Sequence, residues 1–153
     1  TIKRVKELGL WLEVVTLIIP RMNDTTEELW EAGRFLSSIS PDIPWHVTAY
    51  HPDYKEDAPP TPSETLQRAA EIGQEAGLRY VYAGNLPGRV GSLEDTLCPH
   101  CGKGLVLRRG YRLIGYHITD TGTCEFCSNP IAGVWQAGAG RHSGHGFPRR
   151  VSY

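Results

Sequence analysis

The chain has 153 residues, a net charge of −1 and 40% hydrophobic residues, enough for one medium domain or a domain with a small module. The balanced charge excludes an overall basic surface for nucleic acid and an acidic tail. No apolar run reaches the roughly 18 residues that span a membrane, and no signal peptide is visible. We therefore expect a cytoplasmic protein without membrane contact.

The N-terminal residues predict a helix followed by a buried strand. Residues 1–8 carry apolar side chains at helical spacing, and Gly9 follows where a helix favours a left-handed residue. Residues 10–19 are β-branched and almost continuously apolar, which predicts a strand buried on both faces, as in a parallel sheet. Because the sequence begins with a helical pattern and has no initiator methionine, we expect it to be a piece of a longer protein.

A second helix and strand follow. Asp24 and Glu27 fit a capping box at the start of a helix. Residues 45–50 predict the next strand. The apolar face that would pack the helix on the sheet holds Leu29, Ala32, Leu36 and Ile39.

A third helix is expected where Thr61 can act as N-cap and Pro62 can take the first helical position. Residues 78–82 then predict a third strand. Alternating helices and strands with short loops predict parallel βα units with right-handed crossovers. Because three strands cannot close a barrel, we expect an α/β fold in which residues 1–90 are the C-terminal βα units of a partial TIM barrel.

All four cysteines lie in two C-x2-C pairs, Cys98 with Cys101 and Cys124 with Cys127. The tight turn in each pair aims both sulfurs inward, and two such pairs complete a closed four-thiolate site, which is the structural zinc pattern. The alternatives are an iron or redox site, two disulfides or four free thiols. We predict a zinc ribbon over residues 91–135, with a β-hairpin between the two pairs.

The remaining histidines near the cysteines and in the tail fit solvated positions. His100 lies inside the first pair and could replace a cysteine, but with four cysteines present we expect a turn residue. Residues 136–153 are rich in Gly, His and Arg, which predicts a disordered tail. His142 and His145 have the spacing of metal ligands there, yet we expect them to be solvated.

Three loops follow the predicted strands, at residues 20–24, 51–55 and 84–88. In parallel α/β folds, functional residues collect on such loops. The second loop is the richest, since it begins with His51 and adds a carboxylate, a phenol and an ammonium. A plain turn is the alternative interpretation of this loop.

Several segments resemble radical SAM enzymes. Residues 17–24 resemble the fifth-strand motif of the pyruvate formate-lyase activating type, and residues 45–54 are similar to its sixth strand. Residues 46–54 and 77–85, the two cysteine pairs with their Gly-Tyr hairpin, and residues 133–135 resemble, in this order, the C-terminal half of the AmmeMemoRadiSam-system radical SAM protein. The resemblance covers residues 1–135.

The resemblance implies a partial TIM barrel that holds a 4Fe-4S cluster on a CxxxCxxC loop. S-adenosylmethionine (SAM) binds that cluster and is cleaved to a radical that removes a substrate hydrogen. His51 matches a position near the adenine of SAM, Ile18 matches an apolar position of the same site, and the four cysteines match the C-terminal cysteines of the family. This chain lacks CxxxCxxC, so alone it should neither hold the cluster nor turn over.

The implied partners are SAM, an unknown substrate and the other proteins of the AmmeMemo system. The alternative function is a stand-alone zinc-ribbon module that binds nucleic acid or protein through Arg108, Arg109 and Arg112. Because these arginines lack a wider basic face, we do not expect nucleic acid as a partner.

Overall fold

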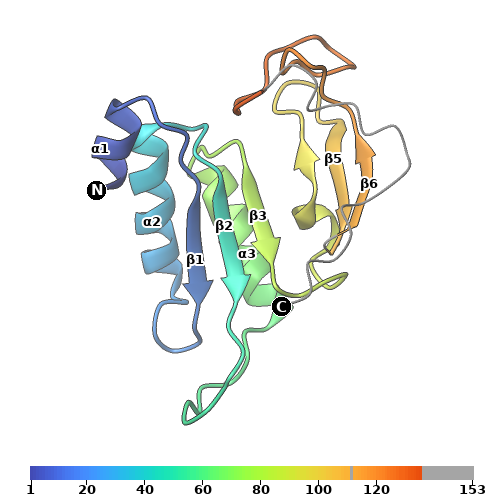
Figure 1. The fold of residues 1–153 in the computed structure, drawn as a ribbon. Coiled ribbons are helices and arrows are strands. Elements are labelled where there is room, and N and C mark those ends of the chain that lie inside the picture. The colour runs from blue at the N-terminus through green and yellow to red at the C-terminus, as the bar shows by residue number, and fades with distance from the viewer. Residues whose placement is uncertain (111, 136–153) are drawn as a thin grey trace, which may run out of the picture.

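The computed structural model describes residues 1–110 and 112–135. The predicted disordered tail, with His142 and His145, lies outside these residues. The described residues form a mixed α/β structure with one parallel and one antiparallel sheet, each of three strands (Figure 1). Within the described residues, no helix is both long enough and apolar enough to cross a membrane.

The first sheet is parallel, with the order β1-β2-β3. It confirms the parallel pairing predicted from the alternation of elements. Figure 1 shows α2 and α3, the two crossover helices, on the same face of this sheet. The elements are α1 (Ile2–Glu7), β1 (Val14–Ile18), α2 (Thr26–Ile39), β2 (Trp45–Ala49), α3 (Ser63–Glu75) and β3 (Val81–Gly84).

The core lies between the sheet and these helices. On β2, Trp45, Val47 and Ala49 are buried, while the alternating His46 and Thr48 are only partly buried. This alternation follows from the two-residue period of a strand, which sends successive side chains to opposite faces. One sheet face therefore forms the core, and no helix of residues 1–110 and 112–135 covers the other face.

A close helix–sheet approach depends on Gly73 in α3. A Cβ built at this position would lie 2.8 Å from the indole ring of Trp45, closer than carbon atoms pack. The bulky Trp45 side chain is fully buried at this contact. Glycine at position 73 thus lets α3 pack directly on the largest core side chain.

Helix α2 begins one residue later than the sequence suggested. Its N-cap is Thr25, whose side-chain oxygen accepts a hydrogen bond from the Glu28 N–H at 3.3 Å. The Thr25 hydroxyl in turn donates to the Glu28 carboxylate at 2.7 Å. The capping pair is therefore Thr25 and Glu28, and the carboxylate of Asp24 instead accepts from the Arg21 N–H at 2.8 Å.

The predicted N-cap of α3 is also displaced. Pro62 occupies the N-cap position, and Thr61 is buried just before it. The Thr61 hydroxyl donates to the carbonyl of Ile18 at 2.6 Å and accepts from the Tyr50 N–H at 2.9 Å. Thr61 therefore joins the ends of β1 and β2, a long-range contact that local helix signals do not contain.

The prediction that the first strand is buried on both faces is wrong. Val15 is 65% exposed and Leu17 is 45% exposed, because they lie on the face away from α2 and α3 and the described residues do not cover that face at β1. Ile18, on the same strand, is fully buried. The described part of the chain thus leaves two apolar side chains of β1 exposed to solvent.

The second sheet is antiparallel and confirms the predicted hairpin between the cysteine pairs. It packs beside β3, where the Tyr80 hydroxyl accepts a hydrogen bond from the Ala132 N–H at 3.3 Å. The hydroxyls of Tyr82 and Thr96 lie 3.0 Å apart at the same junction. The elements are the 3-10 helix η1 (Gly91–Glu94), β4 (Thr96–Leu97), β5 (Gly104–Arg109) and β6 (Arg112–Tyr116).

The exposed side of β1 leads to a prediction about stability. Val15→Lys should change the free energy of unfolding by less than about 0.5 kcal/mol, because the side chain is already solvated. Ile18→Lys should cost at least about 3 kcal/mol, because it places a charge in the core. Urea unfolding of both variants measures the difference, and equal losses would contradict this description of β1.

Candidate metal centre

The four cysteines of the two pairs converge on one point. Their sulfur atoms all lie within 4.8 Å of one another, with Cys98 Sγ 3.6 Å from Cys127 Sγ and Cys101 Sγ 3.8 Å from Cys124 Sγ. Around a tetrahedral zinc with bonds of about 2.3 Å, neighbouring sulfurs lie about 3.8 Å apart. These distances exclude disulfides, whose sulfurs are about 2 Å apart. The site could hold a single metal ion such as zinc.

The two cysteine pairs share one backbone design. The Gly102 N–H donates to the Cys98 carbonyl at 2.9 Å, and the Ser128 N–H donates in the same way to the Cys124 carbonyl at 2.9 Å. Gly102 has φ 71° and Ser128 has φ 60°, so both turns use the left-handed region. The short polar Ser128 can adopt this conformation at some cost, whereas Gly102 adopts it freely.

Each turn is closed by a second bond from its first cysteine. The Cys98 N–H donates to the Lys103 carbonyl at 2.8 Å, and the Cys124 N–H donates to the Asn129 carbonyl at 2.9 Å. These backbone hydrogen bonds hold each turn in place without a contribution from a metal ion. The site is thus built from two equivalent turns that face one another.

The ribbon's own small core supports the inner half of the site. Cys98 is 2% exposed and Cys124 is 1% exposed, and they belong to one cluster with Leu105, Ile118 and Ile131. Cys101 is exposed, and Cys127 is partly exposed. Two ligands therefore come from the core and two from the surface.

The local surroundings shift the pKa values of two of the four thiols in opposite directions. The Asn129 side-chain amide, 3.5 Å from Cys127 Sγ, and the Asn129 backbone N–H lower the pKa of Cys127 to about 6. For Cys101, the Lys103 backbone N–H lowers the thiol pKa, but lost hydration and the other sulfurs outweigh it and raise the pKa to about 11. Metals bind thiolates, so binding at neutral pH would displace a proton from Cys101.

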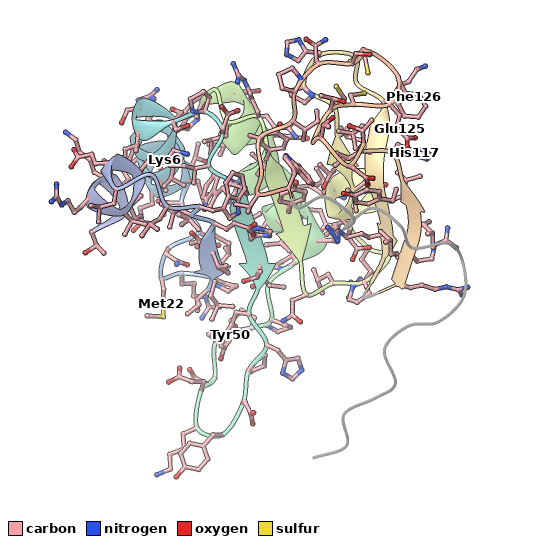
Figure 2. The ribbon with its side chains drawn as sticks, turned by 45° about the horizontal axis from the view of Figure 1, so that its top comes forward. Lys6, Met22, Tyr50, His117, Glu125 and Phe126 are labelled. Atoms are coloured by element: carbon pink, nitrogen blue, oxygen red, sulfur yellow. The ribbon has the colours of Figure 1, made fainter. Side chains whose placement is uncertain are left out.

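The outer surface of the ribbon carries a group of polar and aromatic side chains. Figure 2 shows His117, Glu125 and Phe126 close together on this side of the ribbon. His117 Nδ1 lies 3.2 Å from a Glu125 carboxylate oxygen, and the His117 and Phe126 ring centroids are 5.1 Å apart. The Lys103 ammonium lies 4.6 Å from the Phe126 ring centroid. These contacts brace the second turn from outside.

His100 is exposed in the first turn and does not belong to the group of ligand atoms that converge. This agrees with the expectation that it is a turn residue. A closed set of four sulfurs leaves no coordination position for a substrate, so the centre fits a structural role.

The two residues predicted to contact SAM lie near the C-terminal ends of adjacent strands. Ile18 ends β1, is 0% exposed and packs in the helix–sheet core. His51 lies just beyond β2 and is exposed in a loop that extends past the sheet (Figure 1). The structure brings neither residue near the cysteines, and their role at SAM stays a prediction.

A buried phenol lies at the base of this loop. Tyr50 Oη is buried without a hydrogen-bond partner among the described residues, and Figure 2 shows Tyr50 where the loop leaves the sheet. Burial raises the pKa of Tyr50, and the carboxylates of Glu56, Asp57 and Asp53 raise it further. The loop is therefore acidic on the side that faces this phenol.

A polar pair that was not predicted from the sequence lies on the helix-free face of the sheet. His46 Nε2 lies 2.9 Å from a Glu13 carboxylate oxygen, and the His46 ring stacks on Tyr82 with centroids 4.9 Å apart. The sequence signal for this pair was the position of His46, a polar residue between the apolar Trp45 and Val47 in the predicted strand. The partner on the neighbouring chain segment could not be identified without the strand register.

Comparison with known proteins gives one relative at clear similarity. An uncharacterized protein of Methanocaldococcus jannaschii is 41% identical over 135 residues, which cover 86% of this chain and 40% of that protein. The chain thus spans about two fifths of the length of this relative. No family model matches the chain, and no solved structure matches it.

The geometry predicts the effect of removing a cysteine. Cys98→Ser should abolish binding of one zinc equivalent and unfold the ribbon, because it removes a buried ligand of the small core. Zinc titration with a chromogenic chelator and amide hydrogen exchange, which reads the sheet and the ribbon separately, measure both effects.

His100→Ala is the matched control, because His100 lies in the same turn but outside the converging group. It should keep full zinc binding. Zinc binding that survives Cys98→Ser, or is lost in His100→Ala, would contradict the four-cysteine assignment.

Proposed function

We propose that this chain is the C-terminal part of a radical SAM enzyme of the AmmeMemoRadiSam type. The observation that carries the proposal is the ordered resemblance of residues 17–24, 45–54 and 77–85 and of the two cysteine pairs to that family. In such an enzyme, a 4Fe-4S cluster and SAM would generate the radical that removes a hydrogen from the substrate. The cluster motif would come from a part of the longer protein that this chain does not contain.

The architecture supports a partial TIM barrel. Strands β1, β2 and β3 are parallel and adjacent, and their crossover helices cover one face, as in consecutive units of a barrel. The apolar, exposed edge strand β1 suits pairing with a further strand, since unpaired edges are costly for a protein. Val15 and Leu17, which lie on the face away from the helices, would then point into the interior of the barrel.

In this proposal, His51 has the main role toward SAM. It lies at the C-terminal end of β2, where parallel α/β folds place binding residues. An exposed imidazole there can hydrogen-bond and stack on a purine ring. The four-cysteine centre would hold zinc and stabilise the end of the barrel without taking part in the reaction.

The chemistry also suggests where the enzyme works. Free cysteines at a metal site fit a reducing compartment, and we place the enzyme in the cytoplasm. The partners in this proposal are SAM, an unidentified substrate and the other proteins of the AmmeMemo system.

The full-length protein that contains this chain provides the test. After anaerobic reconstitution with iron and sulfide, it should release deoxyadenosine from SAM when reduced. His51→Ala should raise KM for SAM about tenfold with a smaller effect on kcat, because it removes a binding contact. His100→Ala, an exposed histidine in the ribbon, should leave both constants unchanged. A full-length protein without CxxxCxxC, or without deoxyadenosine release, overturns the proposal.

The second candidate is a nucleic-acid-binding ribbon, and the pairing of β5 with β6 favours it. Arg109 and Arg112 lie directly opposite each other on the two strands, and both are exposed. Their like charges repel each other, which is destabilising. A bound phosphate group would offset this repulsion. Among the described residues, neither arginine forms an ion pair.

This candidate predicts salt-dependent binding of single-stranded RNA. The double variant Arg109→Gln, Arg112→Gln should lower the affinity about tenfold and reduce the salt dependence. Arg4→Gln removes an exposed charge on α1 and serves as the control. Fluorescence anisotropy with a labelled oligonucleotide measures the effect, and equal binding by both variants excludes the candidate.

A further inference from the structure

A cavity of about 840 Å³ lies between the helix-free face of the parallel sheet and the ribbon. We call it the sheet–ribbon cavity. Its volume falls in the range of small-molecule sites. Both parts of the chain contribute, since His46 and Tyr82 line it from the sheet and Thr96 and Arg108 line it from the ribbon. Neither part alone forms this space.

The sheet side offers two aromatic rings that stack on each other across neighbouring strands. The rings of His46 and Tyr82 are stacked, with an interplanar angle of 22°. Trp11 and Tyr116 also line the cavity. Such a group of rings suits an aromatic ligand, because edge-to-face and offset contacts between rings add to the burial of apolar surface.

The orientation of these rings is fixed by hydrogen bonds. The Glu13 carboxylate binds His46 Nε2 through one oxygen at 2.9 Å and accepts from Trp11 Nε1 through the other at 3.0 Å. The Tyr82 hydroxyl is held by Thr96 at 3.0 Å. Burial raises the pKa of Tyr82, so this phenol stays neutral at the cavity wall. The rings are therefore organised without a ligand.

Two carboxylates, Glu13 and Glu94, and one guanidinium, Arg108, line the cavity, and they differ in whether they have a partner. Both Glu13 oxygens are engaged, and the other acidic residue of the lining, Glu94, accepts a hydrogen bond from the Gly110 N–H at 3.3 Å. The Arg108 guanidinium has no hydrogen-bond or ion-pair partner among the described residues, although its backbone N–H donates to Asp95 at 2.6 Å. A free cation at the edge of an aromatic cavity favours an anionic ligand group.

We propose that the sheet–ribbon cavity binds a small planar aromatic molecule that carries an acidic group, with the ring on His46 and Tyr82 and the acid on Arg108. The ribbon then supplies a ligand-binding arginine in addition to its metal centre. The inference concerns binding alone, and it stands whether or not the longer protein carries out radical chemistry.

The sequence around this site supplies matched controls. Arg108 and Arg109 are adjacent and both exposed, but only Arg108 lines the cavity. His46 and His51 are likewise close in sequence, but only His46 lines it. Arg109→Gln and His51→Gln therefore remove the same chemical groups outside the site.

The probe is anilinonaphthalene sulfonate, an anion with a planar naphthalene ring whose fluorescence rises on binding. Phenylnaphthylamine, which has the same ring system without the sulfonate, reports the contribution of the acid. The sulfonate dye should bind the chain saturably and more tightly than the neutral dye. Arg108→Gln should weaken the sulfonate dye about tenfold and leave the neutral dye unchanged. His46→Gln should weaken both dyes about threefold.

Several results would overturn the inference. These are an absence of saturable binding, equal affinity for the two dyes, or an effect of Arg109→Gln as large as that of Arg108→Gln. Binding that survives the cavity variants but is lost in Val15→Lys would instead place the dye on the exposed face of β1. Circular dichroism confirms that each variant is folded, and all substituted side chains are at least partly exposed.

Discussion

The convergence of four sulfur atoms is the constraint on which the C-terminal half of the structure depends. The ribbon has one small buried cluster, and two of its members are the ligands Cys98 and Cys124. A core of this size stabilises little by itself, and a metal ion held by both turns would add to its stability by joining them. The position of the antiparallel sheet against β3 depends on other contacts, in which Tyr80 bonds to Ala132 and Tyr82 to Thr96.

The parallel sheet has a different basis. Its strands are short, and its stability comes from one face packed on two amphipathic helices, with Trp45 seated against Gly73. Its other face holds His46 and Tyr82 and is covered in part by the ribbon. Because Tyr80 belongs to the ribbon cluster and Val81 to the sheet core, the two parts meet within two consecutive residues of the chain.

Local patterns were sufficient for much of this architecture. The apolar periodicities and the glycine and proline positions identified the helices, and the alternation of elements identified the parallel sheet. The capping residues of α2 were displaced by one position, because adjacent Asp24 and Thr25 are both good caps and the choice depends on which side chain the turn engages. The burial of β1 could not be predicted, since an apolar strand has the same sequence whether or not a neighbour covers it.

By itself, the sequence determined the four-cysteine site, because the C-x2-C spacing fixes the direction of both sulfurs in each turn and only two such pairs exist. Only the tertiary structure decided that Glu13 holds His46 and that Arg108, not Arg109, lines the cavity. These relations join residues far apart in the chain and depend on strand register and on how the ribbon packs against β3. The alternation of side chains along a strand does not reveal the register or the packing. A shift of the register by one residue would move every side chain of the strand to the opposite face of the sheet.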